Sequence, residues 1–394
     1  MPGPMEGIKV IEIGIWVAGP SAGGILADWG ADVIKIEAPA GDPLRSIQEV
    51  LGTAVNPFFE PDNRGKRSIV LDLRQADDRA VALELIAGAD VLLTNLRPAA
   101  LARLGLDPET LLARDPRLIY AIVTGYGLEG PDAASGAYDM GAFWARGGVA
   151  DSLSVPGEYL PTQRSGMGDH FTGVTVAGMV SAALYSREQT GQGQLVSTSL
   201  LRTAAYFINS DFNFQLMAGL EAGYTNRRTQ RNPLWNNYTA GDGKSFWLIG
   251  VEADRHWPML IRVLVKPEWA ADERFGTRIA REQNAAELIA LMDAEFARHP
   301  RSVWAGRFDA EPDFFWAPVN TVAEAIADPQ TAASGAFVEV ADGSYDRPMV
   351  ASPADFHGTP WTVRTRAPRL GQHSDEIRAE VAGRRAAASE RTPT

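Results

Sequence analysis

The stretch that decides the fold is GIKVIEIGIWVAGPSAGGILADWGADVIKIE, residues 7–37. Gly7 to Ile13 is apolar and β-branched and indicates a strand, Gly14 to Pro20 a glycine-rich turn, Ser21 to Trp29 a helix, and Ala31 to Glu37 a second strand. Strand, helix and strand in this order predict two parallel strands joined by a right-handed crossover. The chain therefore begins as an α/β protein.

The same alternation continues to about residue 200. Strand patterns at 67–74, 90–94 and 118–123 are separated by helical patterns, and a long helix follows Asp169. This predicts a doubly wound, Rossmann-like large domain. From Tyr224 the chain turns polar and then mixes strand and helix patterns. We therefore expect a large domain over 1–200, a linker over 201–224, a small α+β domain over 225–328 and a C-terminal segment over 329–394.

Composition excludes several classes of function. The 394 residues include no cysteine, which leaves out disulfides, thiolate metal sites and thiol catalysis. The five histidines show no metal-ligand spacing, so we expect no metal. A net charge of −12 disfavours nucleic acid and anionic lipid as partners. Without a membrane-length apolar run or a signal-peptide pattern, we expect a soluble, cytoplasmic protein that does not enter a membrane.

Two familiar motifs fail on inspection. Gly14, Gly19, Gly23 and Gly24 miss the G-x-G-x-x-G spacing of a dinucleotide site, although the strand-end acid Glu37 stands where a ribose ligand would. The sequence 19–23 spells G-x-S-x-G, but it follows the first strand of the chain and has proline before its serine, unlike a hydrolase elbow. Neither nicotinamide binding nor serine hydrolysis is indicated.

Positive charge gathers at two strand boundaries. Asn63-Arg-Gly-Lys-Arg67 leads into one predicted strand, and Asn95-Leu-Arg-Pro98 leaves the next, with Arg103 shortly after. Ligands of open α/β sheets bind outside the carboxyl ends of the strands, and arginine forks suit phosphate groups. The alternative is that both clusters are ordinary solvated surface. Against an acidic background, we favour an anionic small ligand.

The best candidate nucleophile is Asp169, in the stretch Ser165-Gly-Met-Gly-Asp-His-Phe-Thr-Gly173. Glycines precede it and a helical run follows, which predicts an aspartate at a helix start. The positive end of the helix is expected to lower the pKa of this carboxyl and keep it ionised. In a chain without cysteine, an ionised aspartate is well placed for covalent chemistry. The alternative is a helix N-cap without catalytic function.

These residues together resemble the class III CoA-transferase family, which includes formyl-CoA transferase, carnitine CoA-transferase and 2-methylacyl-CoA racemase. The resemblance runs nearly end to end and is carried by Ala18–Pro20, Gly30–Glu37, Lys66–Ile69, Asn95–Pro98, Arg103–Gly105, Gly191–Gln194, Ala317–Val319, Asp328–Pro329, Ala367–Gly371 and His373–Glu376. It implies a Rossmann-like large domain completed by the C-terminal segment, and a homodimer whose two chains interlock.

The resemblance also implies the chemistry and the site. Asp169 falls on the family's nucleophile, which attacks an acyl-CoA thioester and passes CoA to a carboxylic acid acceptor. CoA thioester is then a substrate, and no tightly bound cofactor is implied. Arg97, Arg103, Asn95 and Leu71 are expected to bind CoA. The expected wall of the active site comprises Val17, Ala18, Tyr138, Asp139 and Gly168.

Two alternatives stay open at the sequence level. Racemases of the family carry histidine where this chain has Tyr138, and a neutral phenol is a poor proton-transfer base. His170, beside Asp169, is expected to point in another direction and to replace that histidine poorly. Val17 stands where formyl-CoA transferase has glutamine, which favours a larger or less polar acyl group. A CoA-binding protein without turnover is the second alternative.

Overall fold

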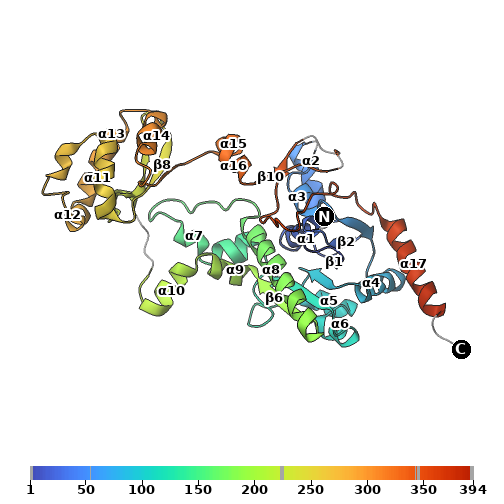
Figure 1. Ribbon diagram of the computed structural model, residues 1–394. Coiled ribbons are helices and arrows are strands. Elements are labelled where there is room, and N and C mark those ends of the chain that lie inside the picture. The colour runs from blue at the N-terminus through green and yellow to red at the C-terminus, as the bar shows by residue number, and fades with distance from the viewer. Residues whose placement is uncertain (1–2, 54, 222–225, 342, 344–346, 391–394) are drawn as a thin grey trace. The chain divides into compact units, whose positions relative to one another are not determined.

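The computed structural model describes residues 3–53, 55–221, 226–341, 343 and 347–390 (Figure 1). The chain divides into two compact units. The first comprises the described residues within 1–154, 159–222 and 332–394, and the second those within 155–158 and 223–331. The expected boundary at 224/225 lies outside the described residues. The segment that we expected to be a linker forms helices α9 (Leu200–Phe207) and α10 (Asn209–Ala218).

The first unit is built on a six-stranded sheet in which all neighbours are parallel. Its order is β3-β2-β1-β4-β5-β6. The strands are β1 (Lys9–Ile13), β2 (Asp32–Glu37), β3 (Arg67–Val70), β4 (Val91–Thr94), β5 (Ile119–Thr124) and β6 (Gln194–Ser199). The order reverses between β1 and β4, which is the topology of a doubly wound sheet. The α/β prediction with a parallel sheet is confirmed.

Both faces of this sheet are buried, because successive side chains of a strand point to opposite sides. Val10 and Leu93 enter one core with residues of α1 (Ala18–Asp28) and α8 (Met167–Thr190). Ile11 and Leu92 enter a second core with α4 (Ala76–Ala87), α5 (Pro98–Leu104), α6 (Pro108–Arg114) and α17 (Ser374–Glu390). Figure 1 shows α17 beside α4. Helices α1 and α8 therefore cover one face of the sheet, and α4, α5, α6 and α17 cover the other.

The C-terminal segment joins the edge of the large sheet. The His373 backbone N–H donates to the Ser68 carbonyl at 2.9 Å, and Arg67 pairs with Glu380 at 2.6 Å. The other elements of this unit are α2 (Ile47–Leu51), α3 (Phe59–Asn63), the π-helical turn η2 (Met140–Ala145), α7 (Val149–Ser152) and the antiparallel pair β10 (Phe337–Val338) and β11 (Met349–Val350). Helix α16 (Pro329–Ala333) spans the limit between the units.

The second unit has its own sheet and its own aromatic core. Strands β7 (Trp235–Thr239), β8 (Ser245–Ile249) and β9 (Trp316–Pro318) form an antiparallel sheet. Its helices are α11 (Ala253–Leu264), α12 (Arg278–Gln283), α13 (Ala285–Phe296), α14 (Arg301–Asp309) and α15 (Val322–Ala327). Phe296, Trp304 and Phe308 are fully buried within this core. The unit is therefore stabilised independently of the large sheet.

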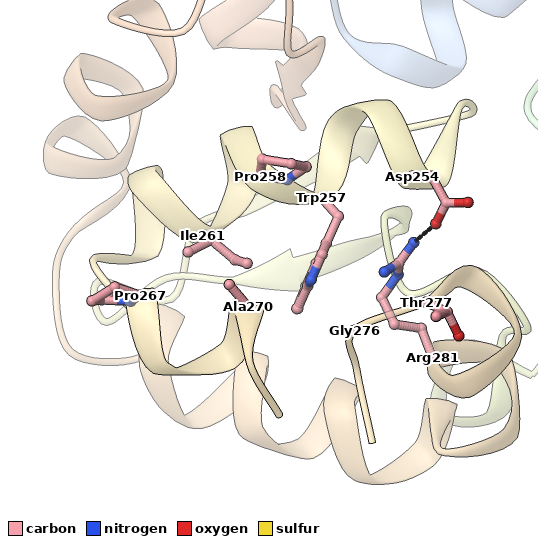
Figure 2. Close-up of a pocket in the computed structure, with 9 residues that line it drawn as sticks. All are labelled: Asp254, Trp257, Pro258, Ile261, Pro267, Ala270, Gly276, Thr277 and Arg281. Atoms are coloured by element: carbon pink, nitrogen blue, oxygen red, sulfur yellow. Dashed lines mark hydrogen bonds and ion pairs between the residues drawn. The ribbon is translucent and has the colours of Figure 1, made fainter. Parts of the chain in front are cut away.

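A pocket of about 450 Å³ lies within the second unit (Figure 2). It is lined by Asp254, Trp257, Pro258, Ile261, Pro267, Ala270, Gly276, Thr277 and Arg281. The Arg281 guanidinium pairs with Asp254 at 2.5 Å and lies over the Trp257 ring, 5.0 Å from its centroid. Because Asp254 already neutralises this arginine, the pocket offers no free cation for the phosphates of CoA. It contains none of the residues predicted for the active site.

Candidate active site

The loop after β1 is tied to the end of β4 at the point where the strand order reverses. The Asn95 side chain accepts the Ile15 backbone N–H at 3.0 Å and donates to the Ile15 carbonyl at 2.7 Å. Gly14 and Gly19 allow this approach, since a side-chain carbon on either would lie 3.2 Å from the Asn95 side chain. Asn95 was predicted to bind CoA. In the structure, both the oxygen and the nitrogen of its side-chain amide form hydrogen bonds that hold the loop after β1.

Asp169 is the third residue of α8, and the helix begins differently from our prediction. The N-cap is Gly166, whose φ of 71° suits glycine, and no side chain caps the helix. The interpretation of Asp169 as an N-cap is therefore wrong. Gly168 packs directly on η2, because a side-chain carbon there would lie 2.5 Å from Phe143 Cγ. Among the described residues, the Asp169 carboxylate accepts no hydrogen bond, so it is free to react.

The electrostatic prediction for Asp169 is also wrong. Its pKa is raised from 3.8 to about 7, chiefly by burial and then by the negative charges of Asp139 and Asp62, while His170 acts in the opposite direction. The field of a helix terminus contributes at most about 2 kcal/mol. Desolvation and two nearby carboxylates outweigh it. Asp169 is thus poised to gain or lose its proton near neutral pH.

Asp139 and His170, the two charged side chains with the largest effect on the pKa of Asp169, are each hydrogen-bonded to a residue from another part of the chain. Asp139 Oδ2 accepts a hydrogen bond from Gln163 Nε2 at 3.1 Å, and Gln163 is only 6% exposed. His170 Nε2 lies 3.2 Å from Asp62 Oδ1, and this bond raises the pKa of the imidazole. Sequence reasoning missed Gln163 and Asp62, which belong to no motif, and it gave His170 too little weight.

The predicted wall residues surround the start of α8. Val17 Cγ1 would lie 3.6 Å from a side-chain carbon placed on Gly166, and Ala18 is buried as the first residue of α1. Trp16, which has a φ of 64°, presents its ring edge-on to Tyr138, with centroids 5.6 Å apart. Tyr138 is 63% exposed. The wall on this side is therefore apolar and aromatic.

A buried ionic network fixes the loop that carries Val17. Lys35 pairs with Glu12 at 2.9 Å and with Asp42 at 3.0 Å, while Lys66 pairs with Glu12 at 2.7 Å. Asp42 Oδ1 also accepts the Trp16 backbone N–H at 3.1 Å. Burial lowers the pKa of Lys66 to about 8. All four charged side chains are at most 2% exposed, so the network supports the loop from beneath.

The two basic clusters differ in whether their cations are paired with carboxylates. In the cluster 63–67, Lys66 belongs to the buried network, Arg64 pairs with Asp28 at 2.7 Å, and Arg67 pairs with Asp32 at 2.7 Å. The expectation that this cluster serves an anionic ligand is therefore wrong.

In the second cluster, Arg97 and Arg103 are exposed on α5 and form no ion pair within the described parts of the chain. The guanidinium of Arg97 lies beside Gly136, where an added side-chain carbon would be 3.3 Å from Nη2. Leu71, the remaining residue predicted to bind CoA, is 1% exposed in the second core of the sheet. Arg97 and Arg103 are therefore accessible to an anionic ligand. The Leu71 side chain is buried and cannot contact a ligand at the surface.

The sequence matches a family model described as CoA-transferase family III over residues 5–374. The chain belongs to CoA-transferase family III. The predicted family is thereby confirmed, and the protein is a CoA-transferase. Its relatives include the cinnamoyl-CoA:phenyllactate CoA-transferase of Clostridium sporogenes, 31% identical over 385 residues, which cover 95% of this chain and 93% of that protein.

A second relative is the succinate–glutarate CoA-transferase of Agrobacterium fabrum. It is 33% identical over 393 residues, which cover 96% of each chain. Among solved structures, a CaiB/BaiF family protein from Brucella suis is 32% identical and superposes with a TM-score of 0.84, over 97% of this chain and 100% of that chain. The whole described fold is therefore that of the family.

No described helix combines the length and the apolar character needed to cross a membrane. In the same part of the chain, no group of three or more histidine, aspartate and glutamate side chains is arranged to hold a metal ion.

Proposed function

We propose that this CoA-transferase moves CoA from an acyl-CoA thioester to a carboxylic acid through a covalent intermediate on Asp169. One observation carries the proposal. The Asp169 carboxylate is half-buried, accepts no hydrogen bond from the described residues, and stands at the start of α8 next to the loop after β1. A carboxylate with a raised pKa is a better nucleophile than an ordinary one, provided that it is ionised when the substrate arrives.

The proposed exchange has four balanced steps. An Asp169 oxygen attacks the thioester carbonyl, the C–S bond breaks, and CoA leaves as thiolate from a mixed anhydride. The thiolate then attacks the aspartyl carbonyl and expels the donor acid, which leaves an aspartyl-CoA thioester. The acceptor carboxylate attacks that thioester and releases the thiolate again. Finally the thiolate attacks the acceptor's acyl carbon, and the Asp169 carboxylate is regenerated.

Arg97 and Arg103 are the proposed contacts for the phosphates of CoA. Both are exposed on α5, which follows the carboxyl end of β4. That position is where open α/β sheets bind their ligands. Arginine forks hold phosphate oxygens with two parallel hydrogen bonds. Because neither guanidinium is neutralised by a described carboxylate, both retain their full charge for this purpose.

The surroundings of Asp169 favour an acyl group with an apolar or aromatic body. Trp16, Val17 and Tyr138 supply aromatic and aliphatic surface. Asp62 and Asp139 are both close enough to raise the pKa of Asp169. The second carboxylate of a dicarboxylic acyl group would meet this negative charge and be repelled. We therefore expect kcat/KM to be higher for aryl- or alkyl-CoA donors than for succinyl-CoA.

The test is a hydroxylamine trap with a panel of acyl-CoA thioesters, followed by peptide mapping by mass spectrometry. The proposal predicts a hydroxamate on Asp169 with accepted donors and none in Asp169→Asn. Asparagine keeps the shape of the side chain but cannot attack a thioester. Full transferase activity in that variant would end the proposal. If the substrate α-proton exchanged with solvent without CoA transfer, racemisation would take its place.

We also propose that the enzyme is a homodimer with interlocked chains. Helix α10 buries none of its residues, yet it carries Phe212, Phe214, Leu216 and Met217, and the last two are 76% and 85% exposed. Exposed large apolar side chains gathered on one helix are typical of a protein interface. We expect light scattering to give the mass of two chains.

Interlocking itself has a separate test. Two linked chains cannot separate while folded, so tagged and untagged dimers should not exchange subunits on mixing. They should exchange after joint unfolding and refolding. Exchange under native conditions would show an ordinary dimer, and a monomer mass would reject the dimer altogether.

A further inference from the structure

Negative charge predominates around the proposed nucleophile, and one side chain, that of His170, acts against it. Two carboxylates act on Asp169, namely Asp139 from the segment before η2 and Asp62 from α3, and both oppose its ionisation. His170 of α8 acts in the opposite direction. Lys66 is coupled to Asp62 but is paired with Glu12. The site therefore gathers three carboxylates around one imidazole.

His170 is held by a specific partner. Its Nε2 lies 3.2 Å from Asp62 Oδ1, across 108 residues of sequence. The Asp62 side chain is 7% exposed, whereas that of His170 is 54% exposed. No other described side chain donates a hydrogen bond to the Asp62 carboxylate. A nearly buried carboxylate is stable only when paired, and a protonated imidazole supplies both the charge and the hydrogen bond.

The backbone around α1 holds these two residues in place. Helix α3 lies against α1 so closely that a side-chain carbon on Gly24 would be 2.8 Å from the Asp62 carbonyl oxygen. Helix α8 approaches the same helix at Gly173, where an added carbon would lie 2.1 Å from Ser21 Oγ. Because both helices pack on one rigid neighbour, the distance between Asp62 and His170 is set by the fold.

The N-cap of α8 completes the arrangement. The His170 imidazole folds back over Gly166, where an added side-chain carbon would lie 3.0 Å from its Cε1 and Nδ1. The His170 backbone N–H donates to the Gly166 carbonyl at 2.8 Å. Gly166 therefore leaves space for the His170 ring to reach Asp62.

We infer that Asp62 and His170 form a dyad in which the Asp62 carboxylate keeps the His170 imidazole protonated, so that the positive charge of His170 stands beside Asp169 and cancels the negative charge of Asp62. The inference rests on the proposed function, since the dyad matters because Asp169 must be ionised to attack. His170 is a positioning residue in this scheme, and it acts through the charge of Asp169. The dyad and Asp139 together set the pH range over which the nucleophile is available.

The test is the pH profile of kcat/KM in two variants. His170→Gln retains a side-chain nitrogen that can donate to Asp62 but removes the charge, and Asp62→Asn retains the shape but removes the partner. We expect the acid limb of the His170→Gln profile to move up by about one pH unit, a loss of about tenfold at pH 6 and none at pH 9. Asp62→Asn should move the limb much less than His170→Gln, because it removes a carboxylate that opposes ionisation of Asp169 together with the partner that keeps His170 protonated. The exposed control His357→Gln should not move the limb.

A direct titration supports the kinetics and does not require an active variant. The NMR signals of the His170 ring should titrate with a midpoint above the ordinary value of about 6.5 in the wild-type enzyme, and the midpoint should fall in Asp62→Asn. A midpoint at or below 6.5 in the wild type would overturn the dyad. So would an equal loss of activity at every pH in His170→Gln, which would indicate a role in packing alone.

Failure of the dyad and failure of the proposed function give different results. If Asp169→Asn is inactive and forms no hydroxamate while His170→Gln keeps the wild-type profile, the nucleophile stands and the dyad is wrong. If Asp169→Asn is fully active, the nucleophile itself is wrong.

Discussion

Replacing Asp139 by asparagine should make the enzyme more active in acid. After burial, the negative charge of Asp139 is the largest cause of the raised pKa of Asp169. Asparagine has nearly the same shape, and its side-chain oxygen can still accept the hydrogen bond from Gln163 Nε2. The substitution therefore removes the charge while keeping the packing.

The size of the effect follows from the pKa of Asp169. The wild-type value is about 7. Removing one like charge from a partly buried carboxyl lowers its pKa by about one unit, to about 6. At pH 5.5 the ionised fraction then rises from about 3% to about 24%, an increase of about eightfold, because each unit changes the ratio tenfold. At pH 9 both enzymes are fully ionised and should be equal.

The assay is kcat/KM for one donor and acceptor pair from pH 5 to 9, since this parameter reports groups of the free enzyme. Each value is divided by that of Asp132→Asn at the same pH, which cancels titration of the substrates. Asp132 pairs with Arg146 at 2.6 Å on the same segment and serves as the matched control. A uniform loss at all pH values, or a shift of the acid limb to higher pH, would refute the reasoning.

Four further substitutions test other parts of the site. Arg97→Ala or Arg103→Ala should raise KM for acyl-CoA by about tenfold with little change in kcat, since a hydrogen bond to a charged group is worth about 1.5 kcal/mol. A change in kcat alone would remove both residues from CoA binding. Lys66→Met should reduce the free energy of unfolding in urea by about 2 kcal/mol, because Glu12 would keep Lys35 as its partner while Glu12 Oε2 and the Pro20 carbonyl oxygen would lose their buried hydrogen-bond donor. A change below about 0.5 kcal/mol would mean that the network relaxes easily. Gly168→Ala should cost about 1–3 kcal/mol of stability and reduce kcat, because the new methyl group collides with η2. Wild-type kcat in that variant would show that the start of α8 can shift without harm.

The sequence predicted the parts of the fold that depend on local pattern. Residues 7–37 alone indicate two parallel strands around a helix, and β1, α1 and β2 follow that prediction within a few residues. Asp169 is predicted as the nucleophile because glycines precede it and a helical run follows, and α8 does form there. Arg97 and Arg103 are candidates for CoA binding because strand ends and basic residues coincide. The roles of these three residues stay predictions. Each of these signals lies within a short window of the chain.

Long-range contacts account for what the sequence could not predict. Nothing in the pattern around Asp62 indicates that it meets His170, 108 residues later. The pKa of Asp169 was predicted in the wrong direction because a helix terminus is visible in sequence, whereas burial and the approach of Asp139 are not. The buried pairing of Lys66 with Glu12, 54 residues apart, likewise turned an apparent phosphate site into part of the core.

The raised pKa of Asp169 also bears on the direction of the proposed exchange. In the mixed anhydride, CoA thiolate can attack either carbonyl. Attack on the substrate's carbonyl expels Asp169 and reverses the first step, whereas attack on the aspartyl carbonyl expels the substrate acid and carries the reaction forward. The weaker base leaves more readily, and an ordinary carboxylic acid, with a pKa of about 4.3, is the weaker base beside Asp169. Burial and Asp139 thus favour the second step over reversal of the first. In the fourth step Asp169 is itself the leaving group, and the same raised pKa opposes its release. His170 acts against the rise in the pKa of Asp169 and so moderates both effects.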